Sequence, residues 1–234
     1  MPVNTSQHPD YGLMLPVVKM VRDAVEGDPA IKRGKEIYLP ATFAKTPEGE
    51  YTPHYKEYLA RAYFMGVTGR TKEALIGMVF RKEPTYEMPS ALEALLEDIN
   101  GAGQSLDQIA KDMVGELMEA GKNYLLVDYP EADENLDSET ERRLGLRPTI
   151  ASYPFESLVN WRFEGVKGRQ QLTMAVLRET VDTGTDEFGH DTDYRYRVLR
   201  LRDGVYTQQI YDEGGQTLSE EYSPRMAGGA KFDH

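Results

Sequence analysis

The sequence predicts an α+β protein in which an N-terminal helical segment packs on a mainly antiparallel sheet. Two observations carry this prediction. Up to residue 121 apolar residues recur with the helical period of 3.6, whereas after residue 147 they follow the period of two that is typical of strands. Helices followed by strands indicate the α+β class, because a parallel α/β sheet requires the two to alternate.

Residues 105–130 are the stretch around which the chain is organised. Ser105 and Gln108 have the spacing of a capping box, which predicts a helix start. The apolar face of this helix consists of Leu106, Ile109, Met113, Leu117 and Ala120. Gly121 fits a left-handed C-terminal cap, and residues 123–129 predict a nearly continuous apolar, buried strand.

Two helices are expected at the N-terminal end. The first spans residues 13–26, with Pro16 tolerated because it falls near the first turn. Asp28 and Pro29 begin the second, because proline is favoured at the first helical position, and this helix runs to about residue 38. Residues 1–12 lack the basic and apolar regions of a signal peptide and are expected to form a disordered or docking arm.

Further helices are expected before residue 105. Residues 54–67 form one, which residues 68–71 (TGRT) interrupt or bend before it continues over 72–80. Ser90 and Glu93 repeat the capping-box spacing and begin a short helix. Four tyrosines on this part of the chain are interpreted as core, with a partner surface as the alternative: Tyr51, Tyr55, Tyr58 and Tyr63.

The C-terminal part is expected to be a sheet. The strand candidates are residues 148–153, 158–163, 170–182, 193–201 and 205–211. Asp203-Gly204 is a hairpin signal. The acidic stretch after Pro130 is expected to be an exposed loop with a short helix around residues 138–144, and the tail from residue 223 a loop. We therefore divide the chain into a helical part, residues 1–104, and a helix-plus-sheet part, residues 105–234.

Charge and composition exclude some functions. The net charge is -12, which argues against a sequence-independent DNA clamp, and it is concentrated in residues 83–147. No apolar run approaches the about 20 residues of a membrane span, so no membrane partner is expected. The chain has no cysteine, which excludes a disulfide, a thiol nucleophile and a thiolate metal site.

No catalytic, cofactor-binding or metal-binding constellation emerges from the motifs. Asp128 is the best isolated carboxylate for acid–base chemistry, but it has no visible partner. Asp133, Asn135 and Asp137 alternate as in a calcium loop, but the glycine and terminal glutamate of that loop are not in register. His190 lies among carboxylates of a predicted hairpin tip. Four arginines near tyrosines suggest either a nucleic-acid platform or, as we prefer, ion pairing across strands or subunits: Arg195, Arg197, Arg200 and Arg202.

The order of these elements resembles the N-terminal half of tailed-bacteriophage portal proteins, over roughly residues 10–215. Gly121-Lys122-Asn123-Tyr124 matches the turn between a helix and an apolar strand in that family. A second motif of the YP.E.(I/V).NWR type is matched by Tyr153, Pro154, Glu156, Val159, Asn160, Trp161 and Arg162. Val176 to Glu179 matches a following vLRE strand.

This resemblance implies the wing of a portal, a structural ring subunit without enzymatic activity or cofactor. The ring, usually a dodecamer, stands at one vertex of the virion capsid after assembly in the host bacterial cytoplasm. It lets double-stranded DNA pass during packaging and genome ejection. Its expected partners are further copies of itself, the major capsid protein, the terminase large subunit and a head–tail adaptor protein.

The family's stem, clip and crown have no counterpart in this sequence, so no DNA-contacting or terminase-contacting residue can be assigned. The chain is expected to continue past His234 or to belong to a shortened homologue. Two other hypotheses stay open. One is a different phage head or tail adaptor that binds through sheet edges and tyrosines. The other is a metal-dependent enzyme that uses Asp128, Asp133 and Asp137.

Overall fold

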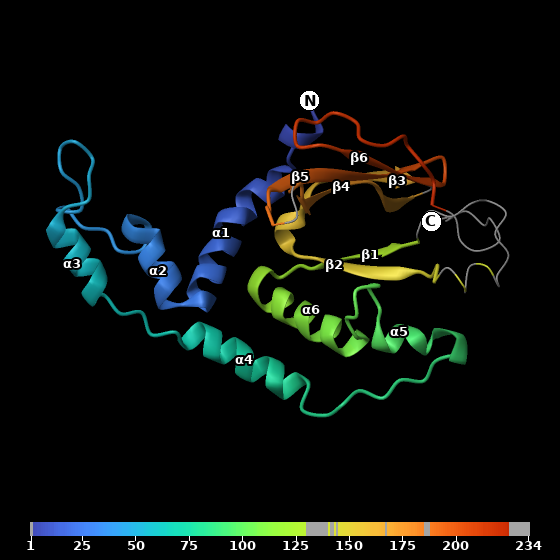
Figure 1. Ribbon diagram of the computed structural model, residues 1–234, viewed down its shortest axis with the longest axis horizontal. Coiled ribbons are helices and arrows are strands. Elements are labelled where there is room, and N and C mark those ends of the chain that lie inside the picture. Colours follow the sequence, from blue (N-terminus) through green and yellow to red (C-terminus); the bar gives the residue numbers. More distant parts are fainter. Residues whose placement is uncertain are drawn as a thin grey trace. The chain divides into compact units, whose positions relative to one another are not determined.

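The computed structural model describes residues 2–129, 140, 143, 145–166, 168–184 and 188–224. In these residues all six α-helices come before the first strand, and the strands form two antiparallel sheets (Figure 1). The predicted α+β class is therefore confirmed. The chain divides into two compact units: a first unit of Met1–Leu13, Met88–Ile109 and Lys122–His234, and a second unit of Met14–Glu87 and Ala110–Gly121.

The helices lie close to the predicted ranges. They are α1 (Pro9–Glu26), α2 (Asp28–Gly34), α3 (Pro53–Arg61), α4 (Val67–Val79), α5 (Ala94–Glu97) and α6 (Leu106–Ala120). The described residues also form short 3-10 turns at Val3–Thr5, Lys35–Ile37, Ser90–Leu92 and Phe155–Ser157. The capping-box prediction holds at Ser105, whose Oγ accepts a hydrogen bond from the Gln108 amide at 3.3 Å, but the Ser90–Leu92 turn has no side-chain cap.

Two helix boundaries differ from the prediction. α1 begins at Pro9 because proline at the first position and Asp10 in the first turn both favour a helix start, which leaves Pro16 inside the helix. The break after α3 lies at residues 62–66, before the TGRT stretch, which belongs to α4. The Phe64 amide donates to Asp28 Oδ1 at 2.9 Å and holds this break extended.

Gly69 is the reason why TGRT does not interrupt the helix. A Cβ atom at this position would lie 2.5 Å from the backbone carbonyl oxygen of Val25. The glycine therefore permits close contact of α4 with the end of α1, a packing role rather than the turn role that its sequence context suggested.

Of the four tyrosines interpreted as core, Tyr55 is buried, whereas Tyr51 and Tyr58 are half-buried against it. Tyr55 is fully buried, and its hydroxyl donates to the Leu39 carbonyl at 2.9 Å. Its ring contacts those of Tyr51 and Tyr58, with ring centroids 5.4 and 5.9 Å apart. Tyr63 is different, because 77% of its surface is exposed in the break after α3.

The strands of the first unit match the predicted ranges within a few residues. A two-stranded sheet pairs β1 (Tyr124–Asp128) with β2 (Thr149–Tyr153), and a four-stranded sheet has the order β3-β4-β5-β6. The strands of the larger sheet are β3 (Leu158–Val166), β4 (Arg169–Asp182), β5 (Thr192–Arg202) and β6 (Val205–Tyr211). Asp203 and Gly204 both have positive φ, 52° and 78°, as a tight hairpin turn requires.

The core of the first unit lies between the two sheets. Leu158, Ala175 and Leu177 form its buried centre, against which β1 and β2 pack through Tyr124, Leu126 and Tyr153. The expectation of a fully buried strand at 123–129 is wrong, because Leu125 and Val127 are 48% and 52% exposed. β1 pairs antiparallel and turns only one face to the larger sheet, so that only alternate residues are covered.

Gly121 follows α6 with a φ of 69°, as the predicted left-handed cap requires. We expect Gly121→Ala to lower the free energy of unfolding by about 1 kcal/mol, because a Cβ atom strains this conformation. Gly12→Ala is the matched control, since a Cβ atom there meets nothing within 4 Å in the ordinary helical conformation of α1. It should leave stability unchanged or raise it by up to about 1 kcal/mol. Urea unfolding measures both, and equal effects would contradict this view of the cap.

Candidate functional site

The YP.E.(I/V).NWR residues form the corner between β2 and β3. Pro154 is extended, and Phe155 after it is fully buried and stacks on Tyr11 with ring centroids 5.6 Å apart. The Glu156 carbonyl accepts from the Tyr11 hydroxyl at 3.2 Å and from Arg178 Nη2 at 3.3 Å. The corner therefore owes its shape to ring packing and to backbone hydrogen bonds, and the side chains of the motif are not gathered into a reactive cluster.

The N-terminal arm docks on this corner. Of the two alternatives expected for residues 1–12, a disordered arm or a docking arm, the structure has the docking arm. His8 stacks on Trp161 with ring centroids 3.9 Å apart, and the His8 amide donates to the Val159 carbonyl at 3.0 Å. Asn4 Nδ2 donates to the Glu213 carbonyl at 2.9 Å. No apolar pattern in the arm indicated this docking, because it depends on one imidazole and on backbone groups.

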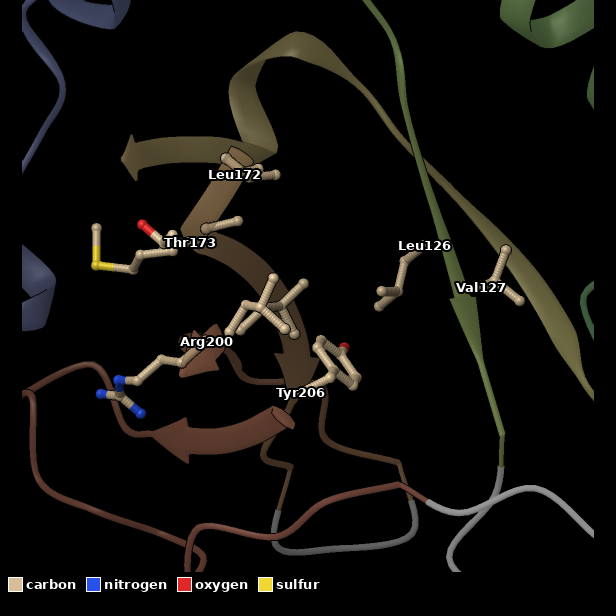
Figure 2. Close-up of a pocket in the computed structure, with 10 residues that line it drawn as sticks. Leu126, Val127, Leu172, Thr173, Arg200 and Tyr206 are labelled. Carbon is tan, nitrogen blue, oxygen red and sulfur yellow. The ribbon is translucent and has the colours of Figure 1, made fainter. Parts of the chain in front are cut away.

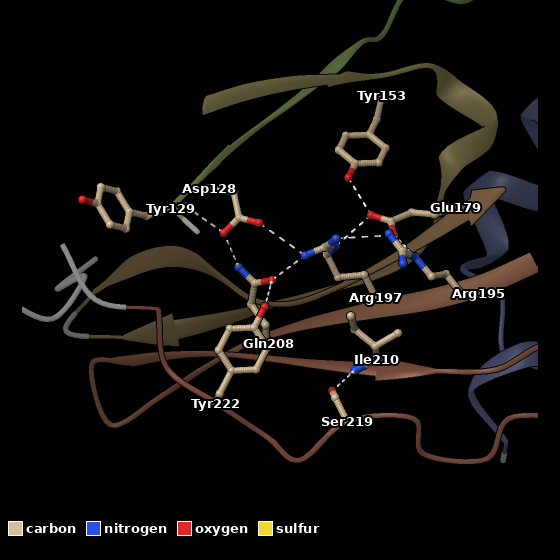
Figure 3. Close-up of polar contacts among 10 residues, drawn as sticks. All are labelled: Asp128, Tyr129, Tyr153, Glu179, Arg195, Arg197, Gln208, Ile210, Ser219 and Tyr222. Carbon is tan, nitrogen blue, oxygen red and sulfur yellow. Dashed lines mark hydrogen bonds and ion pairs between the residues drawn. The ribbon is translucent and has the colours of Figure 1, made fainter. Parts of the chain in front are cut away.

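A polar network between the two sheets is the most elaborate arrangement of charged side chains in the described residues (Figure 3). Its centre is Glu179 on β4, whose two carboxylate oxygens accept from Arg197 Nε at 2.7 Å and from Arg195 Nε at 2.6 Å. The Tyr153 hydroxyl of β2 donates to the same carboxylate at 2.7 Å. Only 9% of the Glu179 side chain is exposed, so these partners replace the water that it loses.

The network continues from Arg197 to the end of β1. Arg197 Nη1 lies 3.3 Å from Asp128 Oδ2 and donates to Gln208 Oε1 at 2.8 Å. Gln208, which is fully buried on β6, donates through Nε2 to Asp128 Oδ1 at 2.9 Å and accepts from the Tyr222 hydroxyl at 3.3 Å. Strands from both sheets are thereby joined by charged and amide groups.

The protonation states follow from these contacts. Burial alone would raise the pKa of Glu179, but hydrogen bonds from Arg197 and Tyr153 outweigh it and hold that pKa below its ordinary value. Burial and the Glu179 carboxylate raise the pKa of Tyr153, so that its hydroxyl remains a donor. Burial opposes the charge of Arg197, but the bond to Glu179 raises its pKa above the ordinary value. The network is therefore a set of fixed charges at neutral pH.

The predicted ion pairing of the arginines across strands, which we preferred to a nucleic-acid platform, is confirmed. Arg195 and Arg197 pair with Glu179 across strands, and Arg200 and Arg202 lie 3.7 and 3.6 Å from Glu221. These guanidinium groups therefore have carboxylate partners within the chain, which does not favour the nucleic-acid platform. Asp128, which the sequence left without a visible partner, is bound to Arg197 and Gln208.

The remaining metal candidates are not assembled in the described residues. Asp133, Asn135 and Asp137 lie outside the described part of the chain, as does most of the helix predicted around residues 138–144. His190 pairs with Asp182 at 2.7 Å, and both side chains are largely exposed. Among the residues that the structure describes, no three His, Asp or Glu side chains are grouped to hold an ion, and no helix has the length and apolar character of a membrane span.

A cavity of about 320 Å³ lies beside the network, between β1 and the larger sheet (Figure 2). Its walls are almost entirely apolar and come from β1, β4, β5 and β6: Leu126, Val127, Leu172, Thr173, Met174, Ala175, Leu199, Arg200, Leu201 and Tyr206. Arg200 is engaged outside it, with Gln209 at 3.0 Å and the Tyr211 hydroxyl at 2.9 Å. The cavity thus lacks the convergent polar groups that a catalytic pocket requires.

Some members of the network had a signal in the sequence and others had none. Glu179 and Arg195 oppose each other directly once β4 and β5 pair, so the hairpin register would have revealed them. Gln208 and Tyr222 meet because residues 217–222 fold back along the outer edge of β6, through bridges to Gln208 and Tyr211. Nothing in the pattern of residues 212–222 indicates that return.

A scan against models of known protein families found no match to this chain, and a search of curated proteins found no similar sequence.

Glu179→Gln should lower the free energy of unfolding by about 3 kcal/mol or more, because it leaves two arginines without their buried counter-charge. Glu221→Gln removes the same charge from a more exposed carboxylate and should cost about 1 kcal/mol or less. Urea unfolding at pH 7 compares the two. A smaller loss for Glu179→Gln than for Glu221→Gln would contradict the central role of the network.

The pH dependence of the same variant provides a second measurement. Because the pKa of Glu179 is lowered in the folded state, its contribution is present above the ordinary value of 4.5 and is lost as the pH falls through the folded value. The stability difference between wild type and Glu179→Gln should therefore shrink below about pH 4.5.

Proposed function

We propose that the chain is the wing of a bacteriophage portal, a structural subunit of a ring at one vertex of the capsid. The observation that carries the proposal is the ordered resemblance over residues 105–179, from the helix and its glycine cap to the vLRE strand. The matched segments follow one another as α6, Gly121, β1, β2, the Pro154 corner, β3 and β4. Continuity of this kind supports a match of folds rather than of isolated motifs.

The chemistry of the described residues also favours a structural role. Glu179 is held by two arginines and a tyrosine, which leaves it poorly suited to accept a proton, and the Asp128 side chain is engaged by Arg197 and Gln208. A ring subunit must keep its shape under the forces that neighbouring subunits exert on it. A network of satisfied charges that joins two sheets favours one arrangement of the strands.

The partners of such a ring follow from the proposal. They are further copies of the chain, the major capsid protein, the terminase large subunit, a head–tail adaptor protein and the double-stranded DNA that passes through the ring. The net charge of -12 fits a conduit that does not retain DNA, because like charges repel the phosphate backbone.

Electron microscopy of the purified full-length product tests the proposal. We expect closed rings with a central opening, and mass photometry should give a mass that is a whole multiple, usually twelvefold, of the protomer. A strictly monomeric product at micromolar concentration would contradict the proposal. Particles of another form that bind phage head or tail proteins would favour the adaptor hypothesis instead.

Isothermal titration calorimetry tests the metal-enzyme hypothesis separately. With Mg²⁺, Mn²⁺ or Ca²⁺ we expect no binding tighter than millimolar, because the Asp128 side chain already contacts Arg197 and Gln208. Asp128→Asn should leave the calorimetric trace unchanged. Micromolar binding that Asp128→Asn abolishes would contradict this assignment and support a metal site at the end of β1.

A further inference from the structure

α4 has an unusual amount of apolar surface in contact with solvent. None of its 13 residues is buried, although a helix of this length is marginal in water without tertiary packing. Val67, Leu75, Met78 and Val79 are 52%, 41%, 64% and 58% exposed. A soluble helix normally turns such residues towards a core, so this surface indicates a binding partner.

The two sides of α4 have different surroundings. One side carries Gly69, Lys72 and Ile76, which recur at helical spacing and lie within the second unit. Gly69 adjoins the Val25 carbonyl, and Lys72 forms an ion pair with Glu119 of α6. The opposite side carries Arg70, Ala74 and Met78, which are all exposed, and the exposed Arg81 follows two residues after the helix ends at Val79. We call these four residues the outer face of α4.

Positive charge accompanies this apolar surface. Residues 61–82 contain the basic side chains of Arg61, Arg70, Lys72, Arg81 and Lys82 and a single acidic one, Glu73. Within the part of the chain that the structure describes, Arg70, Arg81 and Lys82 have no carboxylate within ion-pairing distance. The helix dipole accounts for basic residues near its C-terminal end, but Arg70 stands in the first turn, where a positive charge is unfavourable.

The complementary negative charge is present on the same chain. The second unit contains 13 basic and 13 acidic residues, so that the whole net charge of -12 belongs to the first unit. A basic, apolar face on one unit and an acid excess on the other are the two unlike surfaces that a head-to-tail contact between identical subunits requires.

We propose that the outer face of α4 binds the acidic first unit of a second copy of this chain. The inference deepens the proposed function, since it assigns the subunit contact of the ring. An anionic membrane is the competing partner for a basic apolar helix, but the remainder of the chain would be repelled by it. Self-association avoids this repulsion, because each copy supplies both a basic helix and an acidic unit.

Sedimentation velocity of the full chain at low salt tests the assignment with two double variants. Arg70→Glu/Arg81→Glu should weaken self-association by about tenfold or more, because it places like charges in the contact. Lys56→Glu/Arg169→Glu changes the net charge equally at exposed positions outside α4 and should change the affinity of self-association by less than about threefold. Met78→Gln removes apolar contact without changing charge and should also weaken association.

Zero-length carbodiimide cross-linking of a mixture of ¹⁴N-labelled and ¹⁵N-labelled protein identifies the contact. We expect mixed-isotope cross-links from Lys82 to aspartates or glutamates of the first unit. Links confined to one isotope would overturn the inference. So would binding of the chain to phosphatidylcholine vesicles containing phosphatidylserine that Arg70→Glu/Arg81→Glu abolishes while self-association stays intact.

The outcomes separate this inference from the proposed function. If wild type forms rings and the α4 variants form them equally well, the contact lies elsewhere and the portal proposal stands. If wild type remains monomeric at every concentration, the portal proposal and the inference both fail. Circular dichroism should be unchanged in all variants, because every substituted side chain is exposed or, at Met78, 64% exposed.

Discussion

The interaction on which the first unit most depends is the buried carboxylate of Glu179 with its two arginines and one tyrosine. Hydrophobic contacts bring β1 and β2 onto the larger sheet, but such contacts tolerate sliding of one sheet on the other. Directional polar contacts between the sheets do not, because a shift would separate the Tyr153 hydroxyl from Glu179 and Asp128 from Arg197 and Gln208. The apolar core therefore supplies most of the stability, and the network selects the register in which the sheets meet.

The cavity beside the network follows from the same constraint. The two sheets meet at Asp128, Arg197 and Gln208, and the space beside this contact is lined by small residues such as Thr173 and Ala175. The space of about 320 Å³ between β1 and the larger sheet remains because closing it would displace Asp128 from Gln208 and Arg197. This account makes the cavity a consequence of packing and requires no ligand.

Much of the fold could be predicted from the sequence because its signals are local. The Ser105 cap, the Gly121 turn, the Asp203-Gly204 hairpin and the strand ranges each depend on a few adjacent residues. The failures depend on distant partners. The helix break at 62–66 depends on Asp28, and the close packing at Gly69 depends on Val25. Asp128 meets Arg197 and Gln208 only when β1 packs on the larger sheet.

The partners of Asp128 in the candidate site could not be predicted from the sequence for a related reason. Asp128 looked reactive because a carboxylate at a strand end has no neighbour along the chain, and its true neighbours are 69 and 80 residues away. The arginines, by contrast, could be assigned to ion pairs because β5 alternates them with apolar residues, and a strand so placed must turn its charges towards partners of opposite sign. Ion pairs between adjacent strands can therefore be predicted from the sequence, whereas ion pairs between sheets cannot.

The two units differ in their net charge and in the kind of surface that they expose. The first pairs Asp128 and Glu179 with arginine in the network and carries the whole net charge of -12, and like net charges of this size favour repulsion between first units. The second has no net charge and exposes methionine, valine and leucine on α4, which draws molecules together. In the proposed contact the basic helix of one copy meets the acidic unit of another, because the like net charges of two acidic units oppose their contact. Directional association of this kind is what a closed ring requires and what a symmetric dimer does not.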